Sequence, residues 1–288
     1  IKAESSALVR KMEHAHPDDN WLIPDAYLYF YDAFDEWLGP LGTDEFSKKL
    51  TTLYATIKDN LLLVVIDLEE NDDAQEIFET LNALGTPLLP ADLVKNYLFR
   101  LAVSQNEKPR QLYERYWEKF DNERNYWRKE VRQGRLKRPR LDLFLNHYLT
   151  LMTGEEILIA QLFSDYRSFV EETNGKNAVK HMELFTSYST VYQSFDQFSE
   201  KSREGIFFYR LDQLDTSTVF PLLLEVVKRY NTPDTKGELI EVIEDLESFL
   251  VRRVVCALTP KNYNKLFVEL KKELKKNDNF SASAIRQF

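Results

Sequence analysis

Apolar side chains recur every three or four positions along most of this chain, which is the spacing of an α-helix with one buried face. The sequence contains only 8 glycines in 288 residues, too few for the many tight turns of a β architecture. One long stripe lies within 237–257 and consists of Leu239, Val242, Ile243, Leu246, Phe249 and Leu250. The sequence therefore predicts a mostly α fold, with the helices packed as a bundle.

Helices are predicted wherever this spacing continues. Three of them fall within 1–57, with breaks near 17–20 and 39–43 and a buried face made of Ala26, Tyr29, Phe30, Ala33, Phe34 and Trp37. Later helices are predicted at 72–84, 91–103, 109–130, 141–152, 155–172, 178–198, 216–230, 237–257 and 260–276. Pro221 is expected to kink or delay its helix, and 280–288 is expected to fray.

Segment 61–68 differs from the rest, because it is apolar on both alternating faces and rich in β-branched residues. This pattern predicts a β-strand that is covered on both sides. A lone strand leaves its backbone N–H and C=O groups without partners. The other strand candidate, 206–209, is equally compatible with a helix. Segment 61–68 is therefore predicted to be a residual strand that pairs with sequence upstream of Ile1 or with another chain.

Cysteine content and hydropathy restrict where such a chain works. Cys256 is the single cysteine, which excludes an intramolecular disulfide and a cysteine-based zinc finger and suits a reducing cytoplasm. No stretch approaches the roughly 18–20 apolar residues of a membrane helix. The chain opens on Ile1 without an initiator methionine or a secretory signal. We expect a cytoplasmic fragment of a longer protein that does not contact a membrane.

The charge of the chain is unevenly distributed. Segment 124–140 holds eight basic residues and one acid and carries a charge of +7. Because the net charge of the whole chain is −9, the rest of the chain carries −16. The overall acidity argues against a general nucleic-acid coat, but a basic island can hold phosphates whatever the base sequence. The candidate DNA-binding residues are Arg128, Arg132, Arg135, Lys137 and Arg138. The alternative interpretation is a solvated helix end and loop.

Motifs of catalysis are missing from the sequence. It contains no phosphate-binding loop, no Gly-x-Ser-x-Gly elbow, no His-Glu-x-x-His and no dinucleotide fingerprint. His14 and His16 are two positions apart, so they do not share a helix face, and we interpret them as a solvated helix end. The aromatic stripe within 113–127 could stack bases, but its helical spacing favours core packing. We therefore predict no catalytic residue and no metal ligand in this chain.

Segment 73–99 carries more polar residues on its helix faces than packing requires. Gln75, Glu79 and Asn82 share one face of the first helix, and Asp92, Lys95, Asn96 and Phe99 share a face of the second. Gly85, Pro87 and Pro90 suit a tight turn between the two helices. Polar side chains oppose burial unless they are partnered. The alternative to a functional role is a self-satisfied helical hairpin in which Asp92 and Lys95 pair locally.

This segment resembles the signature Phe-Glu-x-Leu-Asn, Gly-x-x-Leu and Asp-Leu-x-Lys-Asn of the GmrS-like domain-of-unknown-function family, found in GmrSD-type modification-dependent restriction enzymes and related phage-defence proteins. The matching residues are Phe78-Glu79-Thr80-Leu81-Asn82, Gly85-Thr86-Pro87-Leu88 and Asp92-Leu93-Val94-Lys95-Asn96. Segments 112–120 and 248–264 agree with the family as well, so the resemblance runs from about 60 to 275.

The resemblance implies a particular organisation. Family members begin with a ParB/sulfiredoxin-like α+β domain that binds and hydrolyses nucleotide through an Asp-Gly-Gln-Gln-Arg motif. A helical region follows, and many members then have a His-Asn-His nuclease domain. Neither of those two motifs occurs here. The chain is therefore expected to hold the end of the first domain at 1–105, a helical domain at 106–276 and a flexible tail at 277–288.

The resemblance also implies a set of functional residues. Those expected on the nucleotide side of the parent protein's site are Phe78, Glu79, Asn82, Asp92, Lys95 and Asn96. No cofactor is expected in the chain itself, whereas the parent is expected to be a nucleotide-dependent DNA endonuclease that uses a nucleoside triphosphate and Mg²⁺. Expected partners are DNA, through the parent protein, and the missing N-terminal and C-terminal domains. The sequence leaves open whether the chain also forms a homo-oligomer.

Two functions fit these observations. The first is a helical scaffold and relay that couples nucleotide sensing to DNA cleavage and contacts DNA through 124–140. The second is a stand-alone helical protein-interaction module with no nucleic-acid role. Strongly salt-dependent DNA binding would favour the first, and binding to protein partners alone would favour the second.

Overall fold

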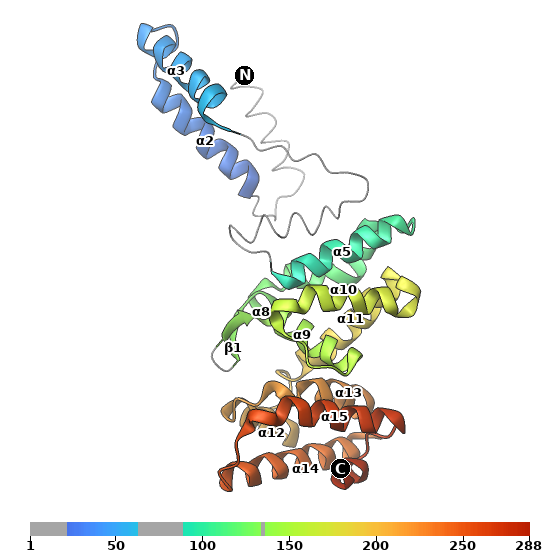
Figure 1. The fold of residues 1–288 in the computed structure, drawn as a ribbon. Helices are drawn as coiled ribbons and strands as arrows, with labels where there is room; N and C mark the ends of the chain where they lie inside the picture. The colour runs from blue at the N-terminus through green and yellow to red at the C-terminus, as the bar shows by residue number, and fades with distance from the viewer. Residues whose placement is uncertain (1–21, 63–88, 134–135) are drawn as a thin grey trace. The chain divides into compact units, whose positions relative to one another are not determined.

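A computed structural model describes residues 22–62, 89–133 and 136–288 of the chain. These residues form helices and one small antiparallel sheet, so the predicted mostly α fold is confirmed (Figure 1). The chain divides into two compact units, Ile1–Ala74 and Gln75–Phe288. The predicted division at residues 105 and 106 stays a prediction. Among the described residues, no helix combines the length and the apolarity needed to cross a membrane.

The described part of the first unit is a pair of helices, α2 (Leu22–Leu38) and α3 (Asp44–Asn60). The predicted break between them is confirmed, because Gly39 and Gly42 adopt positive φ angles of 78° and 87° there. The Thr43 hydroxyl accepts a hydrogen bond from the Phe46 N–H at 3.1 Å and caps α3.

The predicted buried face of α2 is exposed in the structure. Tyr29 is 70% exposed, Phe30 is 58% exposed and Trp37 is 45% exposed. That prediction was wrong for the described residues, since two paired helices cover only the strip between them. Leu61 and Leu62 follow α3 without regular structure, and the rest of the predicted strand lies outside the described residues, as does the helix predicted at 72–84.

The second unit begins with α5 and leads through short helical pieces to the sheet. Its elements here are α5 (Pro90–Ser104), α6 (Pro109–Leu112), the π-helix η1 (Tyr113–Trp117), α7 (Glu118–Asn122), α8 (Arg124–Trp127), β1 (Glu130–Gln133) and β2 (Leu136–Pro139). The single helix predicted at 109–130 is therefore broken. The π-helix accommodates the break, because the Glu118 N–H bonds to the Tyr113 carbonyl five residues back.

The remainder of the unit is helical. It consists of α9 (Arg140–Thr153), η2 (Ile159–Gln161), α10 (Leu162–Glu172), η3 (Asn174–Lys176), α11 (Ala178–Ser194), α12 (Arg203–Gln213), η4 (Ser217–Val219), α13 (Phe220–Tyr230), α14 (Lys236–Val255), η5 (Pro260–Asn262), α15 (Tyr263–Lys276) and α16 (Ala282–Gln287). Segment 206–209 is helical within α12. Pro221 lies in the first turn of α13, after the 3₁₀ turn η4, as expected of a residue that delays a helix.

The core of this unit is aromatic. Trp117 and Trp127 are almost fully buried, and the Trp117 ring stacks on Phe185 with centroids 5.7 Å apart. The core interpretation of the aromatic stripe within 113–127 is thus confirmed. Helices α5, α9, α10 and α11 pack together in one layer, and α13 connects α9 and α11 to α14 and α15 in the next (Figure 1).

The C-terminal segment is ordered by packing and not frayed. Phe280 and Ala282 are buried, and the Ala282 N–H donates to the Glu238 carboxylate at 2.7 Å. Arg286 pairs with Asp245 at 2.6 Å. The expectation of a flexible tail was wrong for 282–287, because the apolar residues are too few and too widely spaced to reveal a short helix that docks on α14.

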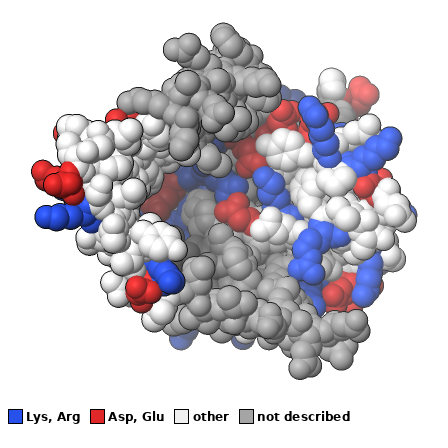
Figure 2. Space-filling model, turned by 90° about the horizontal axis from the view of Figure 1, so that it is seen from above, with Lys and Arg blue, Asp and Glu red and all other residues white. Residues whose placement is uncertain are grey.

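Ion pairs between residues far apart in the sequence mix the two signs of charge over the second unit. Arg229 pairs with Asp278 at 2.6 Å, and Lys236 pairs with the buried Glu204 at 2.9 Å. Figure 2 likewise shows acidic and basic side chains close together on the face that it draws. A segment in which one sign gathers therefore differs from the surrounding surface.

Candidate functional site

The first turn of α5 is held by residues from distant parts of the chain. Pro90 opens the helix at a position that needs no N–H, and the Ala91 N–H donates to Asp142 Oδ1 of α9 at 3.1 Å. This carboxylate satisfies one of the amide groups that a helix start leaves without a partner. Burial raises the pKa of Asp142 to about 6, although the hydrogen bond from Ala91 opposes that rise.

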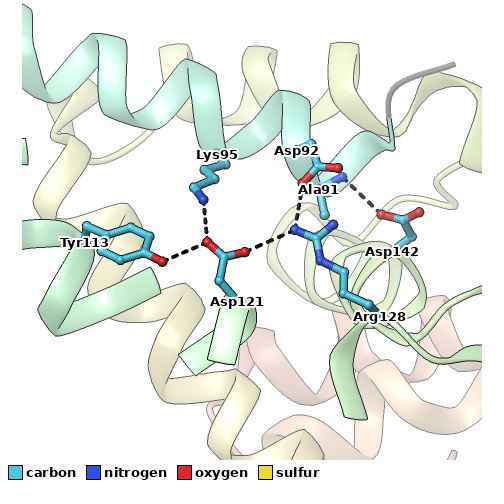
Figure 3. A network of polar contacts seen from close by, with 7 residues as sticks. All are labelled: Ala91, Asp92, Lys95, Tyr113, Asp121, Arg128 and Asp142. Atoms are coloured by element: carbon cyan, nitrogen blue, oxygen red, sulfur yellow. Dashed lines mark hydrogen bonds and ion pairs between the residues drawn. The ribbon is translucent and has the colours of Figure 1, made fainter. Parts of the chain in front are cut away.

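Charged side chains continue this attachment along α5. Arg128 Nη2 lies 2.7 Å from Asp92 Oδ1 and 3.4 Å from Asp121 Oδ1, and Lys95 Nζ lies 2.5 Å from Asp121 Oδ2 (Figure 3). The Tyr113 hydroxyl donates to the same oxygen of Asp121 at 3.1 Å. We call this network the α5 brace, and its members are Ala91, Asp92, Lys95, Tyr113, Asp121, Arg128 and Asp142.

The electrostatics around Asp121 favour the charged form of its carboxyl group. Partial burial opposes ionisation of Asp121, but the hydrogen bonds from Lys95 and Tyr113 and the charge of Arg128 outweigh burial and lower its pKa. Burial and the nearby Asp121 carboxylate raise the pKa of Tyr113 to about 12, so this hydroxyl stays a donor. The network is therefore satisfied internally near neutral pH.

A β-hairpin leaves the α5 brace directly after Arg128. Strands β1 and β2 are antiparallel, and their register places Arg132 opposite Lys137 and Val131 opposite Arg138. Arg132 and Lys137 are both exposed. Like charges directly opposite each other destabilise a strand pair, so this arrangement suits the binding of an anion.

The base of the hairpin is closed by Arg140. Its N–H donates to the Lys129 carbonyl at 2.9 Å, its guanidinium forms an ion pair with Asp196, and it lies 4.1 Å from the centre of the Tyr126 ring. Arg128 precedes the hairpin and Asp142 follows it, and both bond to the first turn of α5. The hairpin is thus attached to α5 on both of its flanks.

The predicted DNA-binding residues fall into separate environments. Arg128 belongs to the α5 brace, whereas Arg132 and Lys137 are exposed on the strands. Arg138 is half-buried, and within the described part of the chain its Nε atom is buried without a hydrogen-bond partner. Arg135 lies outside the described residues. The structure therefore brings Arg132, Lys137 and Arg138 together on one hairpin and separates Arg128 from them.

The predicted nucleotide-side residues divide in a similar way. Phe78, Glu79 and Asn82 lie outside the described residues, and Asn96 is exposed. Asp92 and Lys95 do not pair with each other: their partners are Arg128, 36 residues away, and Asp121, 26 residues away. These two charged groups are thus partnered within the described residues, and their role on the nucleotide side of a site stays a prediction. A group of three or more possible metal-ligating side chains is not found among the described residues.

The sequence did not single out Asp121 and Asp142 as functional residues. Both lie in segments that were predicted to be helical, and neither stands in a recognisable motif. The signal that could have found Asp142 is its place in the first turn of α9, directly after the basic segment. The hairpin was also missed, although Gly134 between two short polar stretches is a turn signal.

A cavity of about 690 Å³ lies beside the hairpin. Val131 and Arg132 of β1 line it together with residues of α9, α11, α12 and α13. A second cavity of about 560 Å³ includes Arg138, and both cavities include His147. Burial lowers the pKa of His147 to about 3, so this ring is neutral at physiological pH.

The fold and these contacts define a helical framework that positions a basic hairpin. Residues 4–99 of the chain match the family model described as GmrSD restriction endonuclease, N-terminal domain. Over these residues, the match confirms the resemblance to GmrSD-type restriction proteins that was inferred from the motif. The match ends within α5, so the agreement of segments 112–120 and 248–264 stays a prediction. Neither a curated protein nor a solved structure matches the chain.

Proposed function

We propose that this chain is the scaffold and relay segment of a GmrSD-type restriction protein, and that it contacts DNA through the β1–β2 hairpin. One observation carries the proposal: both flanks of the hairpin bond to the first turn of α5, and that turn lies within the matched segment 4–99. A change in the position of α5 is thereby passed to the hairpin without crossing a flexible connection.

The contacts within the α5 brace support this role. Arg128 reaches two carboxylates at once, and Asp121 is held from three sides by Lys95, Tyr113 and Arg128. Such a shared, partly buried network has few alternative arrangements, because a group that leaves it would lose its counter-charge in a region with little water. The proposed role of α5 is that of a connector, and no step in it runs through a bound nucleotide or magnesium ion.

Charge supports the contact with DNA. Arg132 and Lys137 face each other on an exposed strand pair, in a chain whose charge elsewhere is strongly negative. Phosphates would therefore be repelled by most of the surface and attracted at the hairpin. This contact would position the protein on a duplex and would not read the base sequence.

A protein-interaction module is the second candidate, and the end of α14 favours it. Val254 is 55% exposed, Val255 is 79% exposed and Leu258 is 50% exposed, which places adjoining apolar side chains in contact with water. A module of this kind would bind a protein partner there and would have no affinity for DNA.

The test replaces Arg132, Arg135 and Lys137 together by Ala and measures duplex binding as a function of salt. Each lost phosphate contact should flatten the slope of log affinity against log salt by about 0.9, so the slope should fall by up to about three units for every sequence tested. The matched control replaces the exposed Lys180, Lys201 and Lys265 by Ala, which removes the same charge elsewhere. An equal loss of duplex affinity in both variants would contradict a role for the hairpin in DNA binding. Unchanged duplex binding in the folded hairpin variant would contradict it as well.

A further inference from the structure

The cavity beside the hairpin has an aromatic wall that is partly open to solvent. Phe208 stacks on Phe195 with ring centroids 4.5 Å apart and on Phe198 with centroids 5.6 Å apart at an interplanar angle of 6°. Phe198 and Phe208 are half-buried, and the neighbouring Tyr209 is 66% exposed. A stack of rings that ends at a cavity can be extended by another planar, aromatic group.

Charged groups of both signs line the cavity. Its basic residues, Arg132 and Arg140, come from β1 and from the first turn of α9, and Arg140 is paired there with Asp196, which also lines the cavity. Glu200, Asp212 and Asp215 come from α12 and the segments on either side of it. A simple anion would meet these carboxylates, and a simple cation would meet Arg132. The lining instead suits a ligand with a negative group at one end and hydrogen-bond donors at the other.

A nucleotide has this distribution of charge and donors. Its phosphate is anionic, its base is planar, and the exocyclic amino groups of adenine, guanine and cytosine donate hydrogen bonds that carboxylates accept. The cavity volume of about 690 Å³ falls within the range of roughly 300–1,000 Å³ that is usual for small-molecule sites. Size therefore permits a single nucleotide unit.

We propose that this cavity binds one nucleotide unit, with the base against the aromatic wall of Phe208 and Tyr209, the base amino edge toward Asp212, and the phosphate at Arg132. The unit is either a free mononucleotide or a nucleotide turned out of a strand held on the hairpin. The second source rests on the proposed contact between the hairpin and DNA. Turning a base out of a duplex costs least where the base is mismatched.

The experiment uses the full 288-residue chain and two kinds of probe. The first probe is a set of deoxynucleoside monophosphates, whose binding is measured by calorimetry. The second is a pair of duplexes that differ only in one central mismatch, whose affinities are compared at one salt concentration. The variants are Tyr209→Ala and Asp212→Asn, both at exposed positions, and the controls are Phe288→Ala and Asp234→Asn, also exposed.

The expected result is binding of at least one probe in a way that depends on the cavity. Tyr209→Ala should weaken monophosphate binding, or the preference for the mismatched duplex, by roughly tenfold, as the loss of base stacking on an aromatic ring does. Asp212→Asn should weaken binding of adenine, guanine and cytosine nucleotides more than that of thymidine monophosphate. Both controls should leave these values unchanged.

The two probes separate the two sources and the two proposals. Monophosphate binding without a mismatch preference identifies a free nucleotide, and the reverse identifies a base turned out of DNA. Duplex binding that depends on the hairpin, with neither effect, overturns the cavity proposal and leaves the hairpin proposal standing. Monophosphate binding that depends on the cavity, without any duplex binding, overturns the hairpin proposal and leaves the cavity proposal standing.

Discussion

The base and the strands of the β-hairpin use the same residue types in opposite ways. At the base, Arg128 and Arg140 are mostly buried and each is paired with a carboxylate of another element. On the strands, Arg132 and Lys137 are exposed and stand opposite each other. A basic segment in a sequence is therefore not one surface: part of its charge attaches the segment to the fold, and part is presented to solvent.

Burial explains this difference. A charge in a region with little water needs a counter-charge, because the cost of dehydration is otherwise too high. An exposed charge has no such requirement, and the proximity of a second positive charge is tolerated there because water screens it. The three predictions below test whether stability and DNA binding separate along this division.

Arg128→Ala should have the largest effect on stability. The change leaves Asp92 and Asp121 without the cation that lies between them, so the free energy of unfolding should fall by about 3 kcal/mol. Denaturant unfolding monitored by tryptophan fluorescence would measure it. Arg124→Ala, at an exposed position of α8, is the control and should change stability by less than about 0.5 kcal/mol. Equal effects of the two changes would show that the α5 brace does not stabilise the fold.

Asp142→Asn should alter how stability depends on pH. Because the folded pKa of Asp142 is about 6 and its usual value is 3.8, the folded chain binds more protons than the unfolded chain between these values, and this group's contribution to stability falls as pH rises through that window. Asparagine keeps an oxygen for the Ala91 N–H but does not ionise. The stability of the variant relative to the natural chain should therefore rise by about 2 kcal/mol from pH 4 to pH 6. A difference that is flat or falls over this range would contradict the prediction.

Lys137→Glu should have the smallest effect on stability, and of opposite sign. The change replaces a like-charge pair with an opposite-charge pair across β1 and β2, so the free energy of unfolding should increase by about 0.3 kcal/mol. Duplex binding should weaken at the same time. Thermal unfolding and a salt titration of DNA binding would measure the two effects, with Lys180→Glu as the exposed control. Loss of stability in Lys137→Glu would place this lysine with Arg128 as a structural residue.

Periodicity predicted the long helices well, because their buried stripes are continuous. Segment 141–152 was predicted as a helix and forms α9, and 237–257 forms α14 with Leu239, Val242, Ile243, Leu246 and Leu250 buried. The hairpin was not predicted, since its strands are short, hold mainly charged and polar residues and contain few apolar side chains. A strand pair stabilised by attachment at its base leaves little trace in hydropathy.

The α5 brace lay beyond prediction for another reason. The sequence showed that Asp92 and Lys95 share a helix face, and the local alternative paired them with each other. Their observed partners come from α8 and α7, and the broken helix within 109–130 brings these partners to α5. Contacts of this kind depend on tertiary packing. The spacing of residues along one helix shows which side chains share a face, but not which distant residues pack against that face.

The π-helix at Tyr113–Trp117 makes the α5 brace sensitive to insertions and deletions. Removing one residue there would convert the π-turn to an α-turn and rotate everything before it by about 100° relative to Asp121, because each α-helical residue turns the chain by that angle. Tyr113 and Asp121 would then no longer meet, although neither had been replaced. The length of this short segment therefore determines the contacts of the α5 brace as much as the identity of its charged residues does.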